Sequence, residues 1–279
     1  MPEVSVLLSV YRGSSPVELA AALDSLWTQT RPADEVVMVE DGPLTADLNE
    51  VLDSHGAAHP ELRRVRLSTN SGLGKALQAG LNTLTSTYVA RLDTDDIAAP
   101  ERLDVQLAWL SEHPDVAVLG TAMREFDDDA WHSTGDLAAA ATKTRALPET
   151  HDAIARYALL NSPVNHPSVM MKVADVKSAG GYRDVHHMED YDLWARLLAS
   201  GARFHNLPEP LTYFRTSAAQ FERRTGKGMF AAEKQMQDNL VRYGLISRPR
   251  AVLNLIVRTT YRLLPTALLT RVYSRLFHR

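Results

Sequence analysis

Short apolar runs alternate with amphipathic helical stretches along the first part of the chain. The nearly continuous runs Val4–Val10 and Glu35–Glu40 predict strands that are buried on both faces. Residues 15–18, Ser-Pro-Val-Glu, form a capping box with proline at the first helical position, and apolar residues follow from Leu19 at helical spacing. Further expected elements are a helix near residues 45–55, a strand at 64–67, a helix at 72–84 and a strand that ends before Asp93. This alternation predicts an α/β fold with a mostly parallel sheet flanked by helices.

Residues 124–150 fit the alternation poorly. The segment is acidic at Glu125, Asp127, Asp128, Asp129 and Asp136, and it has an alanine run at residues 138–141. We expect a solvated excursion from the sheet, with a loop over an acceptor site as the alternative.

Polar residues follow three of the predicted strands. At the first strand they are Ser9, Tyr11 and Arg12, and at the end of the second they are Glu40 and Asp41. Asp93, Asp95 and Asp96 follow the fourth predicted strand. Ligands of open parallel sheets bind beyond the carboxyl ends of the strands, so these groups are expected to converge. The turn at residues 70–75, Asn-Ser-Gly-Leu-Gly-Lys, offers amides and a lysine to phosphate oxygens, and the alternative is an ordinary strand-to-helix loop.

The carboxylates at the end of the fourth strand predict a metal site. Successive strand residues alternate between the two faces, so Asp93 and Asp95 would project from one side. Hard oxygen ligands suit Mn²⁺ or Mg²⁺, and these ions in turn suit a substrate that carries a diphosphate. The alternative is a surface turn.

Composition narrows the class of protein. The chain has 279 residues, 45% of them hydrophobic and 23% charged, which is typical of a globular protein. The absence of cysteine excludes disulfides, zinc–thiolate sites and cysteine nucleophiles, and fits a reducing cytosol. The first residues do not resemble a signal peptide, and no apolar run reaches the ~18 to 20 residues that a membrane-spanning helix needs.

Charge is divided unevenly along the chain. The overall charge is −4, yet eight arginines and no acidic residue follow Asp238. Residues 251–279 predict two basic amphipathic helices, separated at Pro265, that lie on an anionic membrane surface. The arginines expected at the lipid headgroups are Arg258, Arg262, Arg271, Arg275 and Arg279. The alternatives are a helical hairpin packed on the rest of the chain and a homodimer interface. Binding to nucleic acid is not expected, because the remainder of the chain is acidic.

Several short motifs together resemble one known family. In order, they are Val-Ser-Val-Leu-Leu-Ser-Val-Tyr-Arg at residues 4–12, Glu-Asp-Gly at 40–42, Asn-Ser-Gly-Leu-Gly at 70–74, Asp-Thr-Asp-Asp at 93–96, Asn-His-Pro-Ser-Val at 165–169, Gly-Gly-Tyr-Arg at 180–183 and Glu-Asp-Tyr-Asp-Leu-Trp at 189–194. The set resembles the inverting family 2 glycosyltransferases of the GT-A fold, of the kind that acts in bacterial surface polysaccharide assembly. The resemblance covers residues 4 to about 215.

The resemblance implies a role for each of these positions. Ser9, Tyr11, Arg12 and Glu40 would lie at the nucleotide pocket, and Asp41 would bind the base. Asn70, Gly72 and Lys75 would flank the ribose and diphosphate. Asp93 would lie near the ribose or the metal, and Asp95 would be the direct ligand of Mn²⁺ or Mg²⁺.

An inverting transfer also needs a base for the acceptor hydroxyl. By resemblance to the Glu-Asp pair of the family, Asp190 is the expected base, and Glu189 would assist it or contact the acceptor. The alternative is that the pair only complements the dipole of the helix that begins there.

One departure from the family concerns the third metal ligand. Similar enzymes carry a histidine shortly after the segment that corresponds to residues 213–215, and this chain has none there. The other histidines considered are His166, His186, His187 and His205. Arg215 is an alternative that would neutralise the diphosphate.

The sequence therefore predicts a GT-A catalytic domain at residues 1–220, with a nucleotide-sugar-binding half at 1–123 and an acceptor-binding half at 151–220. Residues 221–279 are the helical, basic, membrane-associating extension. The predicted activity transfers a sugar from a nucleotide-sugar, with a UDP-sugar as the first choice, to a saccharide or lipid-linked saccharide acceptor. The predicted location is the cytoplasmic side of the cell membrane, in peripheral association. The alternatives are a nucleotidyltransferase and an inactive scaffold that binds nucleotide-sugar.

Overall fold

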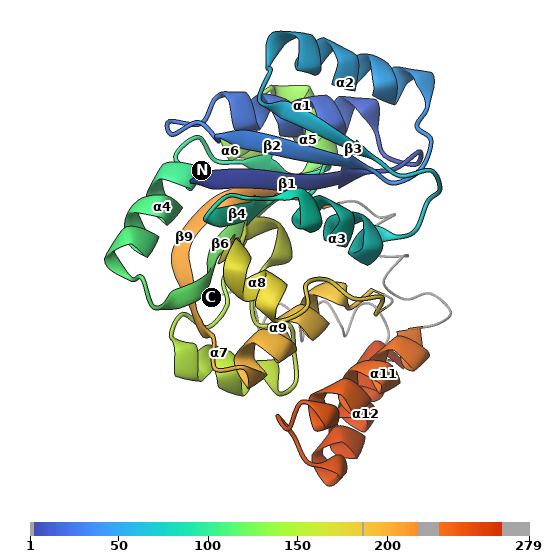
Figure 1. Ribbon diagram of the computed structural model, residues 1–279, viewed down its shortest axis with the longest axis vertical. Helices are drawn as coiled ribbons and strands as arrows, with labels where there is room; N and C mark the ends of the chain where they lie inside the picture. The colour runs from blue at the N-terminus through green and yellow to red at the C-terminus, as the bar shows by residue number, and fades with distance from the viewer. Residues whose placement is uncertain (1–2, 186, 217–228, 264–279) are drawn as a thin grey trace.

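The computed structural model describes residues 3–185, 187–216 and 229–263 (Figure 1). The strands are β1 (Val4–Val10), β2 (Glu35–Glu40), β3 (Leu62–Arg66), β4 (Tyr88–Arg91), β5 (Ile97–Ala98), β6 (Val116–Asp127), β7 (Ala141–Arg145), β8 (Met170–Lys172) and β9 (Arg203–Thr216). The helices are α1 (Pro16–Trp27), α2 (Ala46–Ala58), α3 (Leu73–Thr83), α4 (Arg102–Glu112), α5 (Asp128–Thr134), α6 (Leu137–Ala140), α7 (His151–Ala158), η1 (His166–Ser168), α8 (Val173–Ser178), α9 (Glu189–Ala199), α11 (Met229–Arg242) and α12 (Arg248–Leu263).

The strands form one mixed sheet in the order β3-β2-β1-β4-β8-β6-β9-β5, and β7 pairs with β6 outside this order. The strands β3, β2, β1 and β4 are parallel, as predicted. Beyond them β8 is antiparallel to both β4 and β6, whereas β6 and β9 are parallel to each other. The α/β prediction is confirmed, and the parallel arrangement holds for the half of the sheet that carries the first predicted motifs.

The two faces of the sheet build two apolar layers. Alternate residues of β1, such as Val6 and Leu8, pack with α1, α2 and α4, whereas Leu7 packs on the other face with α3, α8 and α9. Figure 1 shows α1 and α2 on one side of the parallel strands and α3 on the other. Burial on both faces explains why the first strands read as continuous apolar runs.

The segment at residues 124–150 is largely exposed from residue 127 onward, as expected of a solvated excursion, but it has regular structure of its own. It continues β6, forms α5 and α6, and returns as β7 along β6. Phe126 is fully buried and packs with Trp131 at the core of the segment. The acidic side chains are used inside the segment, because Asp127 and Asp136 cap α5 and α6 while Glu125 pairs with Arg145 at 2.6 Å. Asp127 and Asp136 stay exposed while they make these caps, because each cap is a local backbone interaction.

The helices α11 and α12 form a hairpin beside α9 (Figure 1). The carboxylate of Asp192, on α9, is fully buried and accepts three hydrogen bonds: from Arg196 Nε at 2.8 Å, from Asn239 Nδ2 at 2.8 Å and from the Tyr243 hydroxyl at 2.7 Å. Asn239 belongs to α11 and Tyr243 directly follows it. We call this contact the Asp192 junction.

The structure corrects the predicted direction of Arg258. Its guanidinium makes two hydrogen bonds to the buried carboxylate of Glu233 on α11, at 2.6 and 2.7 Å, so it points into the hairpin rather than toward a lipid surface. The packed hairpin that the sequence left as an alternative is therefore what the described residues of the extension form. The rest of the predicted basic tail, at residues 264–279, lies outside the described residues. No helix in the described ranges is long and apolar enough to cross a membrane.

Candidate active site

The predicted carboxylate cluster lies in the turn that follows β4. Oxygen atoms of Asp93, Asp95 and Asp96 lie within 4.8 Å of one another. The turn also touches the end of β1, because the Thr94 hydroxyl donates to the Ser9 carbonyl at 3.4 Å. The predicted convergence of strand ends is thus present, and Asp96 joins the two carboxylates that the sequence singled out as ligands.

Asp96 is the buried member of this cluster. One carboxylate oxygen accepts the Arg215 amide at 3.0 Å, and the other, Oδ2, is buried without a hydrogen-bond partner. Burial raises the pKa of this carboxyl well above its usual range, and the charges of Asp95 and Asp93 raise it further. Three hard oxygen donors, one of them orphaned, fit an Mg²⁺ or Mn²⁺ ion.

Two buried arginines stabilise the turn that carries the cluster, and neither was predicted from the sequence. Arg91 is 1% exposed and its guanidinium bonds to the carboxylate of Asp93 and to the Leu92 carbonyl. Arg102, also 1% exposed, donates to the Arg91 carbonyl at 2.7 Å, and burial lowers its pKa to about 9, which leaves it charged at neutral pH. Arg91 could have been recognised from the sequence, because it is an arginine inside an apolar strand, two residues before Asp93.

The side chain of Arg215 is buried against the carboxylate turn. Its side chain is 2% exposed, pairs with Asp128 on α5, and donates from Nε to the Asp95 carbonyl at 2.8 Å. The guanidinium also lies over the ring of Phe126, 4.9 Å from the ring centroid. Arg215 therefore holds the carboxylate turn against β9 and α5.

Asp41 binds the glycine-rich turn at residues 70–72. Its two carboxylate oxygens accept the amides of Ser71 at 2.7 Å and Gly72 at 3.0 Å, and the Asn70 side chain donates to the Asp41 carbonyl at 3.2 Å. Two backbone amides of the turn that were expected to face phosphate oxygens thus donate to Asp41. Asp41 and Asn70 fix the turn at the end of β2.

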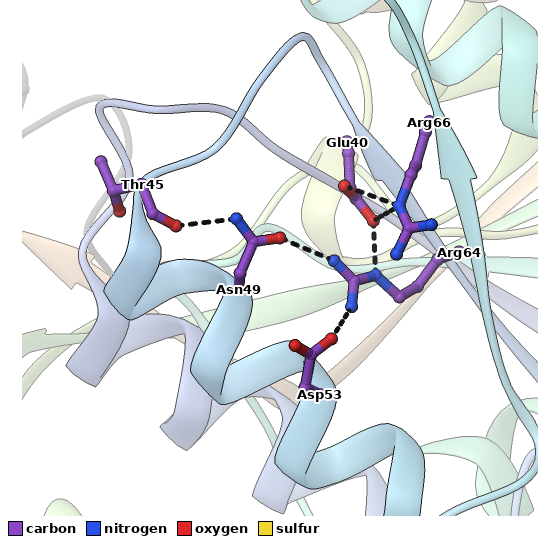
Figure 2. A network of polar contacts seen from close by, with 6 residues as sticks. All are labelled: Glu40, Thr45, Asn49, Asp53, Arg64 and Arg66. Atoms are coloured by element: carbon purple, nitrogen blue, oxygen red, sulfur yellow. Dashed lines mark hydrogen bonds and ion pairs between the residues drawn. The ribbon is translucent and has the colours of Figure 1, made fainter.

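Glu40 faces the neighbouring strand rather than the carboxylate cluster. Figure 2 shows its carboxylate paired with Arg64 and Arg66 of β3, and Arg64 also bonded to Asn49 and Asp53 of α2. The Glu40 side chain is 7% exposed. The structure thus corrects the predicted contact with the nucleotide, because the charge of Glu40 is used to join β2, β3 and α2.

The remaining donor-site residues lie on the open side. Tyr11 is 39% exposed and Arg12 is exposed, both directly after β1. Lys75 is also on the surface and pairs with Asp184 at 2.8 Å, which raises its pKa through the hydrogen bond and the charge of Asp184. An exposed ion pair of this kind exchanges easily for another anion.

The pair Glu189 and Asp190 begins α9, as predicted. A methyl group added at Gly74, near the start of α3, would lie 3.1 Å from Cβ of Glu189, so the glycine lets the turn at 70–75 and the start of α9 meet. Burial raises the pKa of Glu189 to about 7, and the charge of Asp190 is the next largest cause. The Ser162 hydroxyl donates to Oδ2 of Asp190 at 3.2 Å.

The described histidines do not join the carboxylate cluster. His166 is buried, exchanges a hydrogen bond with the Tyr182 hydroxyl at 2.9 Å, and has its pKa lowered to about 3 by burial. His205 stacks on Trp109, with 4.6 Å between the ring centroids. His187 is exposed with φ 58°, and His186 lies outside the described residues.

Fold and site together define an α/β enzyme of the GT-A type, with an acidic turn after a parallel strand and a Glu-Asp pair across from it. A solved structure with this fold is the mannosyltransferase PcManGT from Pyrobaculum calidifontis in complex with GDP-Man and Mn²⁺. The TM-score is 0.62 at 19% identity, over 99% of this chain and 80% of that one. At this identity the likeness shows the fold.

Sequence comparison places the chain in a family. The family model of glycosyl transferase family 2 matches residues 5–172. The amylovoran biosynthesis glycosyltransferase AmsE of Erwinia amylovora is 35% identical over 271 residues, which cover 97% of this chain and 98% of that protein. The UDP-Gal:alpha-D-GlcNAc-diphosphoundecaprenol beta-1,3-galactosyltransferase of Escherichia coli is 33% identical over 278 residues, which cover 100% of this chain and 98% of that protein.

The chain belongs to glycosyl transferase family 2. The resemblance drawn from the motifs is confirmed, and so is the prediction of a glycosyltransferase with a GT-A fold. The nucleotidyltransferase alternative is wrong.

Proposed function

We propose that the protein is a metal-dependent, inverting glycosyltransferase that moves a sugar from a UDP-sugar to a lipid-linked saccharide during surface polysaccharide assembly. The observation that carries the proposal is the cluster of Asp93, Asp95 and Asp96 in the turn after β4, where the charge of Asp93 acts on Glu189 at the start of α9. Family membership supports the class of reaction. The UDP-Gal and diphosphoundecaprenol in the name of one relative support the donor and the acceptor.

On the donor side, Asp95 and Asp93 would hold the ion, and the carboxylate of Asp96, which belongs to the same cluster, would be a further ligand. A bound divalent cation would stabilise the charge that develops on the leaving diphosphate. Asp41 and Asn70 hold the turn that would flank the nucleotide, while Ser9, Tyr11, Arg12, Gly72 and Lys75 are the other proposed donor contacts.

On the acceptor side, Asp190 is the proposed base. Burial and the charge of Asp190 raise the pKa of Glu189 to about 7, so Glu189 holds a proton up to near neutral pH. A carboxylate that holds the charge can take the proton of the acceptor hydroxyl while the hydroxyl oxygen attacks the sugar. Glu189, in its protonated form, can donate a hydrogen bond to the acceptor.

Thermal unfolding with nucleoside diphosphates tests the donor site. With Mn²⁺ present, UDP should raise the melting temperature by mass action, and the shift should disappear in Asp95→Ala. Asp190→Asn should keep this shift and lower kcat about 10²- to 10⁴-fold, the usual range for loss of a general base. A protein that only scaffolds the donor would show the UDP shift, and Asp190→Asn would change nothing further.

The same proposal includes peripheral attachment to the inner face of the cell membrane. Four aliphatic side chains of α12 are strongly exposed: Val252 at 60%, Leu253 at 53%, Ile256 at 57% and Val257 at 46%. We call this surface the α12 outer face. Arg242, Arg248 and Arg250 are exposed near it. Apolar residues flanked by arginines suit an anionic bilayer surface, where a lipid-linked acceptor would reside.

A further inference from the structure

The chain between α7 and η1 is fixed by side chains of α12. Asn254 Nδ2 donates to the Leu159 carbonyl at 2.7 Å. Arg258 Nη1 donates to the Leu160 carbonyl at 2.6 Å and to Oδ1 of Asn161 at 3.1 Å. We call residues 159–162 the α7–η1 turn. Two of its carbonyl groups thus have their partners on the C-terminal extension, about a hundred residues away along the chain.

Both side chains are themselves anchored in the hairpin. Arg258 is bonded twice to Glu233 of α11, which is 1% exposed, and Asn254 Nδ2 also donates to Oε1 of Gln237 at 3.0 Å. Two nitrogens of the planar Arg258 guanidinium bind the Glu233 carboxylate, which fixes the orientation of the group. The third nitrogen, Nη1, therefore points at the turn in a restricted position. The hairpin therefore presents two donors to the turn at set positions.

The next residue of the turn contacts the proposed base. Ser162 donates its hydroxyl to Oδ2 of Asp190 at 3.2 Å. Asp190 stands in the first turn of α9, where the backbone alone does not fix a side-chain rotamer. A path of direct hydrogen bonds and three peptide units thus leads from α12 to the base.

We propose that Asn254 and Arg258 are positioning residues for catalysis: they hold the α7–η1 turn so that the Ser162 hydroxyl keeps the Asp190 carboxylate in its reactive orientation. The inference rests on the proposed function, in which Asp190 is the base. It assigns the C-terminal hairpin a role in the chemical step, besides any contact with a membrane. A shift of about 1 Å in a group far from the reacting atoms can cost about 10²-fold in rate, so such a support has kinetic consequences.

Steady-state kinetics of Ser162→Ala, Asn254→Ala and the double variant test the proposal. Each single change should lower kcat about ten-fold while the KM for the donor stays within about two-fold, since loss of a hydrogen bond to a charged group has an effect of this order. The double variant should be no slower than the slower single variant, because both changes break one path. Ser162→Thr keeps the hydroxyl and should retain most of the turnover.

Arg258→Lys provides a second route if Asn254→Ala does not fold, since lysine keeps a charge opposite Glu233 but lacks the forked donors. Its kcat should also fall with the donor KM unchanged. The matched controls are Ser200→Ala, at the other end of α9, and Gln235→Ala, on the exposed side of α11. Both should leave kcat unchanged.

Two results would overturn the inference: a lower melting temperature with normal kcat in Asn254→Ala and Arg258→Lys, or multiplicative losses of kcat in the double variant. Either result would show that α12 contributes to stability and not to the orientation of Asp190. Normal turnover in Asp190→Asn is a different result, because it would refute the proposed base itself.

Discussion

At the scale of single residues, the decisive feature is that two carboxyl groups occupy consecutive positions at the start of α9. Burial and the charge of Asp190 raise the pKa of Glu189 to about 7. Glu189 therefore still holds a proton in the pH range where an ordinary glutamate is ionised. The sequence showed an acidic pair, whereas the raised pKa of Glu189 follows from its burial in the fold.

We predict that Glu189→Gln changes the pH dependence of stability. The folded protein retains a proton on Glu189 that the unfolded chain releases near pH 4.3, so wild-type stability falls as the pH rises from there through about 7. Glutamine cannot ionise. The variant should therefore gain about 1–2 kcal/mol relative to wild type between pH 5 and pH 8, after allowance for the partial exposure of the side chain.

Urea unfolding of both proteins at the two pH values measures this difference. Glu50→Gln, at an exposed position of α2, is the control and should show the same offset at both. An offset for Glu189→Gln that does not depend on pH would show that the carboxyl titrates normally.

At the scale of elements, the packing of α3 on the sheet shows why glycine occurs inside a helix. A Cβ at Gly80 would lie 2.4 Å from Cδ1 of Leu7 and 2.7 Å from Cγ2 of Val39, so the helix backbone lies close to β1 and β2. Gly56 of α2 has no atom within 4 Å of the same position. The two glycines look alike in the sequence and differ only in what faces them.

We predict opposite effects of the same substitution at these positions. Gly80→Ala should destabilise the protein by about 1–3 kcal/mol, because overpacking outweighs the gain in helix propensity. Gly56→Ala should stabilise it by about 0.5–1 kcal/mol, since only the propensity changes. Thermal or urea unfolding of the two variants decides the matter, and a stabilising Gly80→Ala would mean that Leu7 and Val39 can move aside.

Elements were predictable where a local pattern fixes them. The strands β1 and β2 and the helices α1 and α9 follow from apolar spacing and caps, and the carboxylates at 93–96 follow from the end of a strand. Glu40 and Arg258 were not placed correctly, because their partners Arg66 and Glu233 are chosen by the tertiary fold. The segment at 124–150 is largely exposed, as expected, but its charges did not reveal that β7 pairs with β6.

At the scale of the whole molecule, the hairpin of α11 and α12 has two unlike surfaces. Its inner side carries Glu233, Asn254 and Arg258 and binds the catalytic part. The α12 outer face exposes aliphatic side chains that a monomer in water has no reason to cluster. Membrane binding and homodimer formation both remain predictions for this face.

We predict that replacing the four aliphatic residues of the α12 outer face with serine lowers binding to anionic vesicles at least about ten-fold, because buried apolar area and charge act together in such binding. Wild-type binding should weaken as salt increases. Co-sedimentation with vesicles measures both. Val17→Ser, at an aliphatic position of α1 that is 61% exposed, is the control. Unchanged vesicle binding together with a loss of dimers in size-exclusion chromatography would assign the face to self-association instead.

The Asp192 junction bears on how the extension can be inherited. A relative that exchanged its C-terminal helices for others would strand a fully buried carboxylate on α9, without the partners that Asn239 and Tyr243 supply. Loss of one partner of a buried charge is among the costliest single changes a protein can undergo. Exchange of α11 and α12 alone should therefore be selected against, and these helices should pass between lineages only together with α9, to which they are bound.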